Sequence, residues 1–238
     1  MLLAHKTWPQ VEEYLKTNKR LIIPIGSVEQ HGPTGLVGTD FLTATDISKA
    51  VGEKTKTMVA PSLNYGMASH HMGFSGTATL RPKTLMSVIY DVVESFYTHG
   101  FRNIIFVNGH GGNIAIIQAA MCELKYTEAF VGLDMKLQSW WQLKEISEYE
   151  TKHFGDESGF HATIGEVSVT MYNQKEAFAD IENRLFEIER PKTLFPLSPS
   201  EMRKHYPDGR MASNPGLATY EHGEVLFDLA VQAIANVV

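Results

Sequence analysis

Continuous apolar runs alternate along the chain with segments whose apolar residues recur every three to four positions. Four runs, at 20–26, 57–66, 102–109 and 129–137, have the length and composition of buried β-strands. Helical spacing is found in the segments 40–55, 81–100, 113–126 and 217–238. This alternation predicts an α/β protein in which helices cover both faces of a mostly parallel central sheet, a three-layer α/β/α arrangement.

The segment 81–100 has the clearest helical pattern. Thr84 has a side chain suited to a helix N-cap, and Gly100 is the residue type that commonly ends a helix. No stretch has the composition of a linker, and no repeat of fixed period is visible. A chain of 238 residues suffices for one sizeable core. We therefore expect a single domain over residues 1–238.

Composition argues against two large classes of partner. The formal net charge is −6, and no lysine- or arginine-rich run provides the basic surface that nucleic acid requires. The longest apolar runs are far too short to span a bilayer. The first residues lack the basic start and apolar centre of a signal peptide, and the single cysteine fits a reducing compartment. We expect a cytoplasmic protein that binds neither nucleic acid nor membrane.

Polar, glycine-rich segments follow the predicted strands. They include GSVEQHGP at 26–33, NYGMASHHMG at 64–73 and NGHGGN at 108–113. Five of the ten histidines lie in these segments or after the fourth strand: His31, His70, His71, His110 and His161. Ligands of parallel sheets bind beyond the carboxyl ends of the strands. The convergence of histidines on these ends therefore predicts a functional site.

The residue types at the strand ends suit a divalent transition metal. Glu29 and His31 share one side of an extended segment, and a glycine-rich loop can bring Asp40 back to them. His110 stands between glycines, which allow close approach of backbone or substrate. Such histidine–carboxylate sets favour Zn, Mn or Fe over Ca or Mg. Two other interpretations stay open: NGHGGN as an anion-binding helix start, and HATIGE at 161–166 as a capped turn with a solvated Glu.

Three motifs together resemble the creatininase (creatinine amidohydrolase) family: PIGSVEQHGPTGLVGTD at 24–40, VNGHGGN at 107–113 and HATIGEVS at 161–168. That family also includes formamide deformylases of flavin and deazaflavin biosynthesis and a peptidase that matures a redox cofactor. The resemblance implies a creatininase-like layered α/β/α fold with two divalent metal ions per chain (Zn, Mn or Fe). It implies that Glu29 and His110 hold one metal, that His31 holds the other, and that Asp40 bridges them.

Two positions depart from creatininase proper. Creatininase has a Glu where this chain has Gly112, so the resemblance points to Glu166 as the missing metal ligand and as a catalytic residue. His161 matches the histidine proposed to move protons between water, metal and leaving nitrogen. The residue before it is Phe160 here and Glu in creatininase, so the surroundings of His161 must differ.

The resemblance also implies substrate contacts. Trp141 resembles a tryptophan of the family that caps a small planar substrate. Backbone N–H groups of Gly111 and Gly112 are expected to contact the substrate because they can hold a developing oxyanion. Packing in the core or at an interface is the alternative role for the tryptophan pair at 140–141. The histidine pair at 70–71 lies in a loop where the family builds substrate and subunit contacts, and His70 joins the substrate-binding set.

The resulting hypothesis is a dinuclear metal-dependent amidohydrolase. It would hydrolyse a non-peptide C–N bond, in a cyclic amide or a formamide, of a small nitrogen-rich molecule. One alternative is a formamide deformylase of flavin- or deazaflavin-type biosynthesis. Another is a catalytically inactive protein of the same fold that binds metal or a small molecule. The resemblance further suggests a homohexamer.

Overall fold

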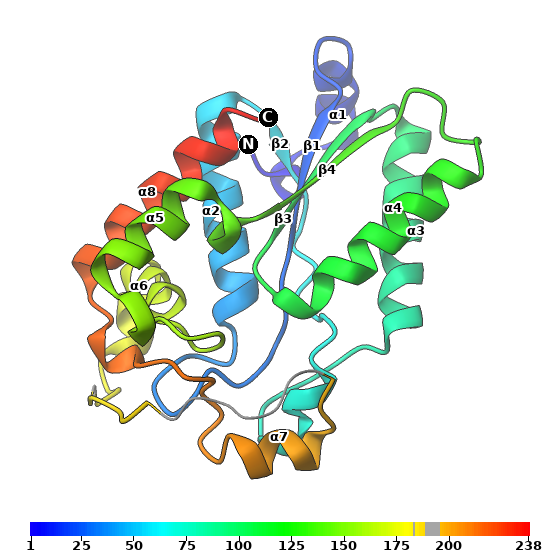
Figure 1. Ribbon diagram of the computed structural model, residues 1–238. Helices are drawn as coiled ribbons and strands as arrows, with labels where there is room; N and C mark the ends of the chain where they lie inside the picture. Colours follow the sequence, from blue (N-terminus) through cyan, green and yellow to red (C-terminus); the bar gives the residue numbers. More distant parts are fainter. Residues whose placement is uncertain (183, 189–195) are drawn as a thin grey trace.

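The four strands of the protein form one parallel sheet in the order β2-β1-β3-β4 (Figure 1). This computed structural model describes residues 1–182, 184–188 and 196–238. The strands are β1 (Arg20–Ile25), β2 (Met58–Val59), β3 (Asn103–Asn108) and β4 (Asp134–Ser139). In register, Leu21 of β1 lies between Met58 and Ile104. The predicted α/β fold with a parallel sheet is confirmed.

Helices cover both faces of the sheet (Figure 1). One face carries α3 (Pro82–His99) and α4 (Ile114–Tyr126), and the other carries α2 (Thr39–Thr55), α5 (Lys144–His153), α6 (Ile164–Asn173) and α8 (Tyr220–Ala235). Alternate residues of β1 point to opposite faces, so Leu21 and Ile23 pack in the α3–α4 core and Ile22 packs in the α2–α6–α8 core. The predicted three layers follow from this alternation.

Shorter helices complete the described residues. The helix α1 (Trp8–Leu15) precedes β1, and α7 (Pro199–His205) lies at the carboxyl end of the sheet (Figure 1). The 3-10 helices are η1 (Leu3–His5), η2 (Ser69–Gly73), η3 (Gly111–Asn113), η4 (Trp140–Gln142), η5 (Gly155–Glu157), η6 (Lys175–Phe178) and η7 (Pro215–Leu217).

Three predicted boundaries are wrong, each for a local reason. The helix α3 begins at Pro82, with Arg81 rather than Thr84 as its N-cap, because the fixed φ of proline suits the first helical position. The strand β2 is short because Pro61, which has no N–H to donate, follows it closely. The strand β4 begins at Asp134, after a turn in which Gly132 has φ 74°. By contrast, Gly100 does end α3, in the left-handed conformation.

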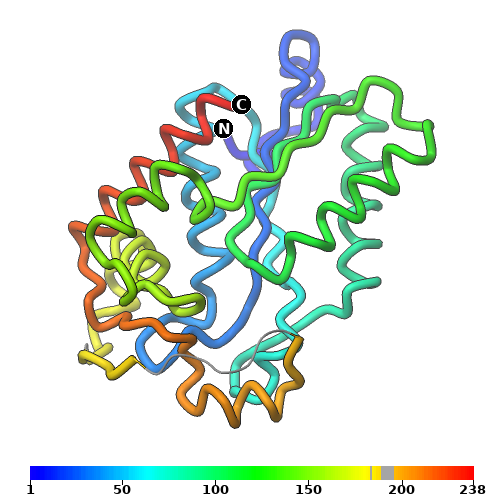
Figure 2. The backbone as a smooth tube through the Cα atoms, viewed as in Figure 1, coloured from blue at the N-terminus to red at the C-terminus, as the bar shows by residue number. Residues whose placement is uncertain are grey.

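The strand order places β1 at the point where the chain switches direction across the sheet. The chain passes from β1 to β2 on one side and returns to β3 on the other, so loops diverge at the carboxyl ends of β1 and β3. Such a switch point is where parallel sheets open a binding crevice. Both chain termini lie at the opposite end of the sheet (Figure 2). There, Lys136 Nζ donates to Val237 O at 2.8 Å.

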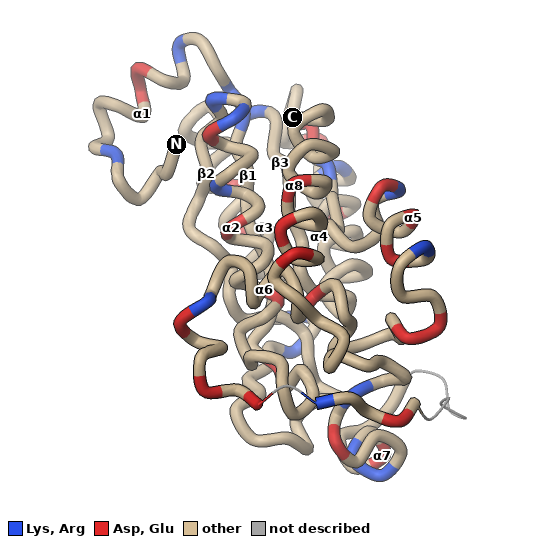
Figure 3. Tube along the Cα trace, turned by 90° about the vertical axis from the view of Figure 1, so that its left-hand side faces the viewer, with Lys and Arg blue, Asp and Glu red and all other residues tan. Residues whose placement is uncertain are grey.

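The surface shows mixed charge. On the face in Figure 3, α5 carries both Lys and Glu, whereas α6 and α8 carry Asp or Glu without Lys or Arg. Within the described ranges, no helix is both long and apolar enough to cross a bilayer.

Candidate metal centre and active site

The loop that leaves β1 carries Glu29 and His31 into the interior, where both are almost fully buried. Ser27 Oγ donates to Glu29 Oε2 at 3.0 Å, and the Glu29 N–H donates to Val37 O at 2.9 Å. His31 Nδ1 lies 3.2 Å from the carbonyl oxygen of Glu29, to which it can donate. This hydrogen bond aims Nε2 of His31 away from the loop, toward Asp40 Oδ1 at 2.9 Å. A backbone partner of this kind orients a metal-binding imidazole.

Asp40 lies in the first turn of α2, and two glycines let the strands approach its backbone closely. A Cβ built on Gly109 would lie 2.1 Å from Asp40 O, and one built on Gly26 would lie 2.3 Å from Phe41 N. The residues that follow β1 and β3 therefore pack directly against the backbone at the start of α2. This close packing, rather than the flexibility of the loop, fixes where the Asp40 carboxylate points.

Replacing Gly109 by alanine is expected to lower the free energy of unfolding by at least about 2 kcal/mol, because the methyl group overlaps a backbone carbonyl. Gly111→Ala is the matched control for stability, since nothing lies within 4 Å of a Cβ built there. Urea unfolding of the two variants measures the difference. Equal stability of the two variants would contradict this close packing between Gly109 and the backbone of Asp40.

His110 follows β3 and faces both carboxylates. Its Nδ1 lies 3.3 Å from Glu29 Oε2 and 3.2 Å from Asp40 Oδ2. Its Nε2 lies 2.9 Å from Met67 O, which can only accept, so the ring proton on Nε2 is engaged there. The lone pair of Nδ1 is thereby directed at the carboxylates in the neutral imidazole. A metal-binding histidine needs this arrangement.

Glu166 lies in the first turn of α6 and serves two purposes. Its Oε2 accepts from the Thr163 N–H at 2.8 Å, while Thr163 Oγ1 accepts from the Glu166 N–H at 3.1 Å, which makes a capping box. The capped turn that the sequence left open is therefore present. The same side chain nevertheless reaches the cluster, because a carboxylate oxygen of Glu166 lies within 4.8 Å of ligand atoms of His31 and Asp40.

These residues form two metal-sized groups that share one member. Ligand atoms lie within 4.8 Å of one another in the group Glu29, Asp40 and His110, and again in the group His31, Asp40 and Glu166. His161 forms a third group of this size with Glu29 and His31. Within the described residues, His31 Nε2 and Asp40 Oδ2 are buried without a well-aligned hydrogen bond. Their polar contacts are instead the ion pairs within the cluster. Buried polar atoms that converge on one another in this way suit a cation. The donor set, two imidazoles and three carboxylates, fits Zn, Mn or Fe.

The clustered charges shift the pKa values of their neighbours. Burial alone would lower the pKa of His31, but the Asp40 carboxylate outweighs burial and raises that pKa to about 10. For His110, the charge of Glu29 likewise overrides burial and holds the pKa well above its usual value. Burial would raise the pKa of Asp40, yet the charge of His31 keeps it well below the usual range. In the metal-free protein the imidazoles of His31 and His110 are therefore doubly protonated and positively charged at neutral pH.

His161 completes the inner wall of the site. Its Nδ1 lies 3.6 Å from Glu29 Oε1, and its ring centroid lies 4.6 Å from that of His31. Burial and, to a smaller extent, the charge of His31 lower the pKa of His161 to about 4. The imidazole is therefore neutral at pH 7.

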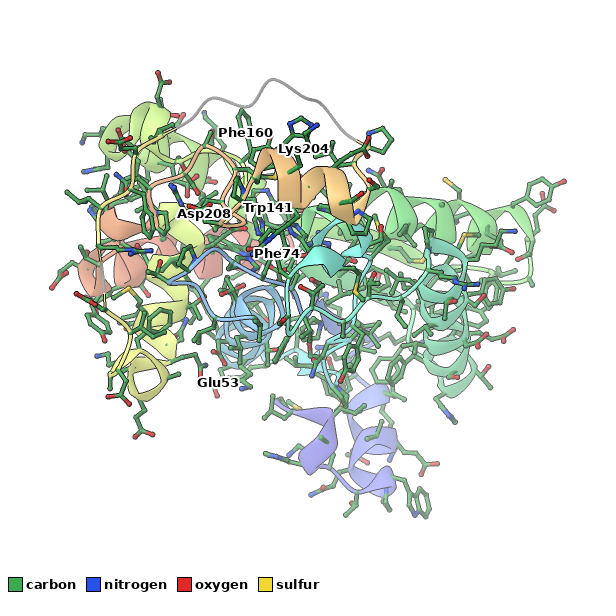
Figure 4. All side chains as sticks on the ribbon, turned by 90° about the horizontal axis from the view of Figure 1, so that it is seen from below. Glu53, Phe74, Trp141, Phe160, Lys204 and Asp208 are labelled. Carbon is green, nitrogen blue, oxygen red and sulfur yellow. The ribbon has the colours of Figure 1, made fainter. Side chains whose placement is uncertain are left out.

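A cavity of about 370 Å³ opens above the cluster. It is lined by most of the predicted site residues: Glu29, His70, His110, Gly111, Gly112, Trp141, His161 and Glu166. Trp140 is fully buried in the core, whereas Trp141 borders the cavity. Viewed from below, Trp141 and Phe160 lie near the middle of this end of the molecule (Figure 4). Phe160 is 77% exposed and forms part of the rim.

Sequence reasoning missed one buried residue of this site, Gln30, and gave no role of its own to another, His71. His71 lines the cavity with its Nε2 3.7 Å from Glu29 Oε1, and Gln30 packs against the rings of His71 and His161. Their positions in motifs already singled out were the available signal. The side-chain contacts of Gln30 reach Gly209, 179 residues away, and no local pattern reveals them.

Glu150 of α5 packs against the start of α6, where its Oε1 would collide with a Cβ built on Gly165. Burial, and then the charge of Glu166, raise the pKa of Glu150 to about 7. The folded protein thus holds an extra proton between the ordinary pKa of 4.5 and pH 7. The resulting contribution to stability is full below pH 4.5 and is lost as the pH rises through 7.

Glu150→Gln is expected to flatten this pH dependence in chelator-treated protein. At pH 8 the variant should be more stable than the parent by up to about 3 kcal/mol, and at pH 4.5 the two should be similar. Urea unfolding at both pH values measures the effect. Glu148→Gln, at an exposed position on the same helix, is the control. A variant less stable than the parent at pH 8 would contradict the raised pKa.

Comparison with known proteins points to one family. The family model described as creatininase, creatinine amidohydrolase, matches residues 4–238. Creatinine amidohydrolase of Pseudomonas putida is 25% identical over 100% of this chain and 96% of that protein. The 3-dehydro-scyllo-inosose hydrolase of Thermotoga maritima is 36% identical, over 46% of this chain and 36% of that protein. A mycofactocin precursor peptide peptidase of Mycolicibacterium smegmatis is 35% identical, over 44% of this chain and 45% of that protein.

Solved structures agree. A creatininase structure designated Mn aligns with a TM-score of 0.82 at 24% identity, over 99% of this chain and 96% of that one. A Glu-to-Gln creatininase variant of the Zn-Zn type aligns with a TM-score of 0.80 at 25% identity, with the same coverage. The same variant complexed with creatine gives 0.80 at 25% identity, again over 99% and 96% of the two chains. With the family model matched over nearly its whole length, the chain belongs to the creatininase family and is a hydrolase of that family.

Proposed function

We propose that this protein is a dinuclear metal-dependent amidohydrolase that cleaves a C–N bond in a small, nitrogen-rich cyclic amide. The observation that carries the proposal is the sharing of Asp40 between two groups of ligand atoms, all from buried residues except the half-buried Glu166, beneath a cavity of small-molecule size. In this proposal Glu29, Asp40 and His110 hold one cation, and His31, Asp40 and Glu166 hold the second. Membership of the creatininase family supports the reaction class.

Two divalent cations in this position would lower the pKa of water, so that hydroxide is available as a nucleophile at neutral pH, and would polarise the amide carbonyl. The residues of the chain have the remaining tasks. His161 presents its unprotonated Nδ1 to the centre of the site, so it can accept a proton and deliver it to the departing nitrogen. Trp141 and the backbone at Gly111–Gly112 bound the space in which a planar substrate would lie.

A formamide substrate is the second candidate, and two observations favour it. A Cβ at Gly112 would lie 2.3 Å from Met67 O and 2.5 Å from His110 Nε2, so a Glu of the creatininase kind does not fit there. In addition, an exposed Phe160 borders the cavity in place of that enzyme's Glu. These two departures from creatininase are the reason to test a formamide beside a cyclic amide. An inactive binding protein is disfavoured by the cost of keeping idle charges buried.

The deciding experiment is proton NMR of creatinine incubated with protein reconstituted in Zn²⁺ or Mn²⁺. Creatine formed above the metal-only control, and absent with Asp40→Ala, would identify cyclic amide hydrolysis. Release of formate from N-formyl amines without creatine formation would select the formamide alternative. Metal-loaded protein that hydrolyses neither class would refute the proposed activity and favour the binding protein.

The quaternary and cellular parts of the proposal are separate. Assembly as a homohexamer, a single domain over 1–238 and a cytoplasmic location are included because they suit the family and the composition. Sedimentation equilibrium of the purified protein tests the hexamer directly.

A further inference from the structure

The side-chain amide of Gln30 has a fixed orientation. Its Oε1 lies 2.8 Å from the Gly32 N–H, which can only donate, and its Nε2 lies 2.9 Å from Gly209 O, which can only accept. Rotating the amide by half a turn would place like groups against each other at both contacts. One hydrogen of Nε2 is therefore committed to Gly209, and a second remains.

That second hydrogen determines the tautomer of His71. Gln30 Nε2 lies 2.8 Å from His71 Nδ1 and 3.1 Å from His161 Nε2. His161 Nε2 is also 2.7 Å from the backbone oxygen of Gln30, an acceptor, so this nitrogen carries a proton and donates it there. His71 Nδ1 is then the acceptor for the amide. The proton of the neutral His71 ring must sit on Nε2.

The two imidazoles thus have the same tautomer but turn opposite nitrogens to the site. His71 presents its protonated Nε2 and His161 its unprotonated Nδ1, at 3.7 and 3.6 Å from the same oxygen, Glu29 Oε1. Their ring centroids are 4.3 Å apart. At 3.7 Å the His71 N–H is beyond a hydrogen bond to Glu29. A donor at the cavity wall therefore faces the space where substrate binds.

The loop at 206–210 is shaped around this amide. Gly209 has φ +90°, a conformation that favours glycine, and a Cβ built there would lie 1.9 Å from Gln30 Oε1. Any side chain at this position would displace the amide. The arrangement of Gln30 thus depends on a residue that touches neither histidine.

We propose that His71 is a substrate-contacting residue whose Nε2–H donates a hydrogen bond to an acceptor oxygen of the substrate, and that Gln30 is the positioning residue that holds this tautomer. The inference rests on the proposed amide hydrolysis and adds a requirement to it. The substrate must present a carbonyl or carboxylate oxygen on the side of the cavity that His71 and His161 share. Donors held in place for a developing oxyanion are a common source of rate enhancement.

The tautomer is tested without turnover, by long-range ¹H–¹⁵N NMR of Zn-loaded protein labelled with ¹⁵N-histidine. The resonances of His71 are assigned by their absence in His71→Gln. We expect a protonated Nε2 and a bare Nδ1, and a downfield shift of the Nε2 proton when formate is titrated as a minimal acceptor. Gln30→Glu, whose carboxylate accepts, should move the proton to Nδ1. Gly209→Ala leaves residue 30 unchanged but should displace its amide, so the His71 proton should no longer be confined to Nε2. The exposed Gln232→Glu should leave the proton on Nε2.

Steady-state kinetics test the contact. His71→Leu should lower kcat/KM by about 100-fold with Zn content unchanged, since it deletes one oriented donor. His71→Gln, which keeps a side-chain N–H, should restore activity to within about tenfold of the parent. Loss of Zn from His71→Leu would make the residue a ligand and overturn the proposal, as would equal activity of the two variants. A proton on Nδ1 would overturn the role of Gln30 even in an active enzyme. The expected tautomer and formate shift in a protein without amidase activity would instead refute the proposed function alone.

Discussion

Asp40→Ala is expected to abolish amide hydrolysis and to remove both metal ions, because Asp40 is the only member common to the two ligand groups. Two cations at such a site supply several kcal/mol of transition-state stabilisation, so we expect kcat to fall by at least about 10³-fold. Metal content by atomic emission and turnover on the same preparations measure the effect. Asp91→Ala, an exposed carboxylate on α3, is the control for loss of a negative charge.

The corresponding change at Glu166 separates the two groups. Glu166→Ala leaves Glu29, Asp40 and His110 in place, so we expect it to lose about one cation per chain and still lose hydrolysis. It also removes half of the capping box, for which about 1 kcal/mol of stability is a reasonable loss. A metal-replete, fully active Glu166→Ala protein would remove this residue from the site and leave the capping role as its whole function.

Zinc binding to chelator-treated protein is expected to release about two protons at pH 7, since the raised pKa values of His31 and His110 leave both protonated before the metal arrives. Because those protons compete with the metal, apparent affinity should rise with pH until the pKa of His31, about 10, is passed. Free zinc at 1,000 times its dissociation constant should also stabilise the fold by about 4 kcal/mol per site.

Isothermal titration calorimetry in buffers of different ionisation heat counts the released protons, and thermal unfolding with and without zinc gives the stabilisation. In Asp40→Ala both effects should be absent. Zinc binding without proton release would contradict the paired, protonated histidines. An unchanged melting temperature would show that the cation does not bind at these buried groups in the folded state.

Much of the fold could be predicted because the two central strands, β1 and β3, are apolar and buried along nearly their whole length. The runs around Ile22 and Phe106 could be buried only between two layers of helices, and the segments between them have helical spacing. The ends of elements were less predictable. The helix α3 starts earlier than predicted because of Pro82, and β4 starts later because of the turn at Gly132, although neither residue changes the hydrophobic pattern.

The candidate ligands were also predictable, because parallel strands bring their carboxyl ends to one edge. Glu29, His31 and His110 each follow a strand directly, so topology alone collects them. The role of Glu166 was less accessible, since it depends on where α6 begins and how that helix packs against α2. The orientation of the Gln30 amide depends on the backbone N–H of Gly32 and on the backbone oxygen of Gly209, 179 residues away, and only the folded structure brings the second of these to it.

The two ligand groups are made at different times during translation. Glu29, Asp40 and His110 are all synthesised before α4, whereas Glu166 follows 56 residues after His110 (166 − 110). At ribosomal rates this interval lasts about 3–10 s. If two cations bind as proposed, a nascent chain that has paired β1 with β3 holds all residues of the first ligand group before the second group is complete. We then expect metal loading to be ordered, with the first ion bound while the α6–α8 side of the sheet is still uncovered.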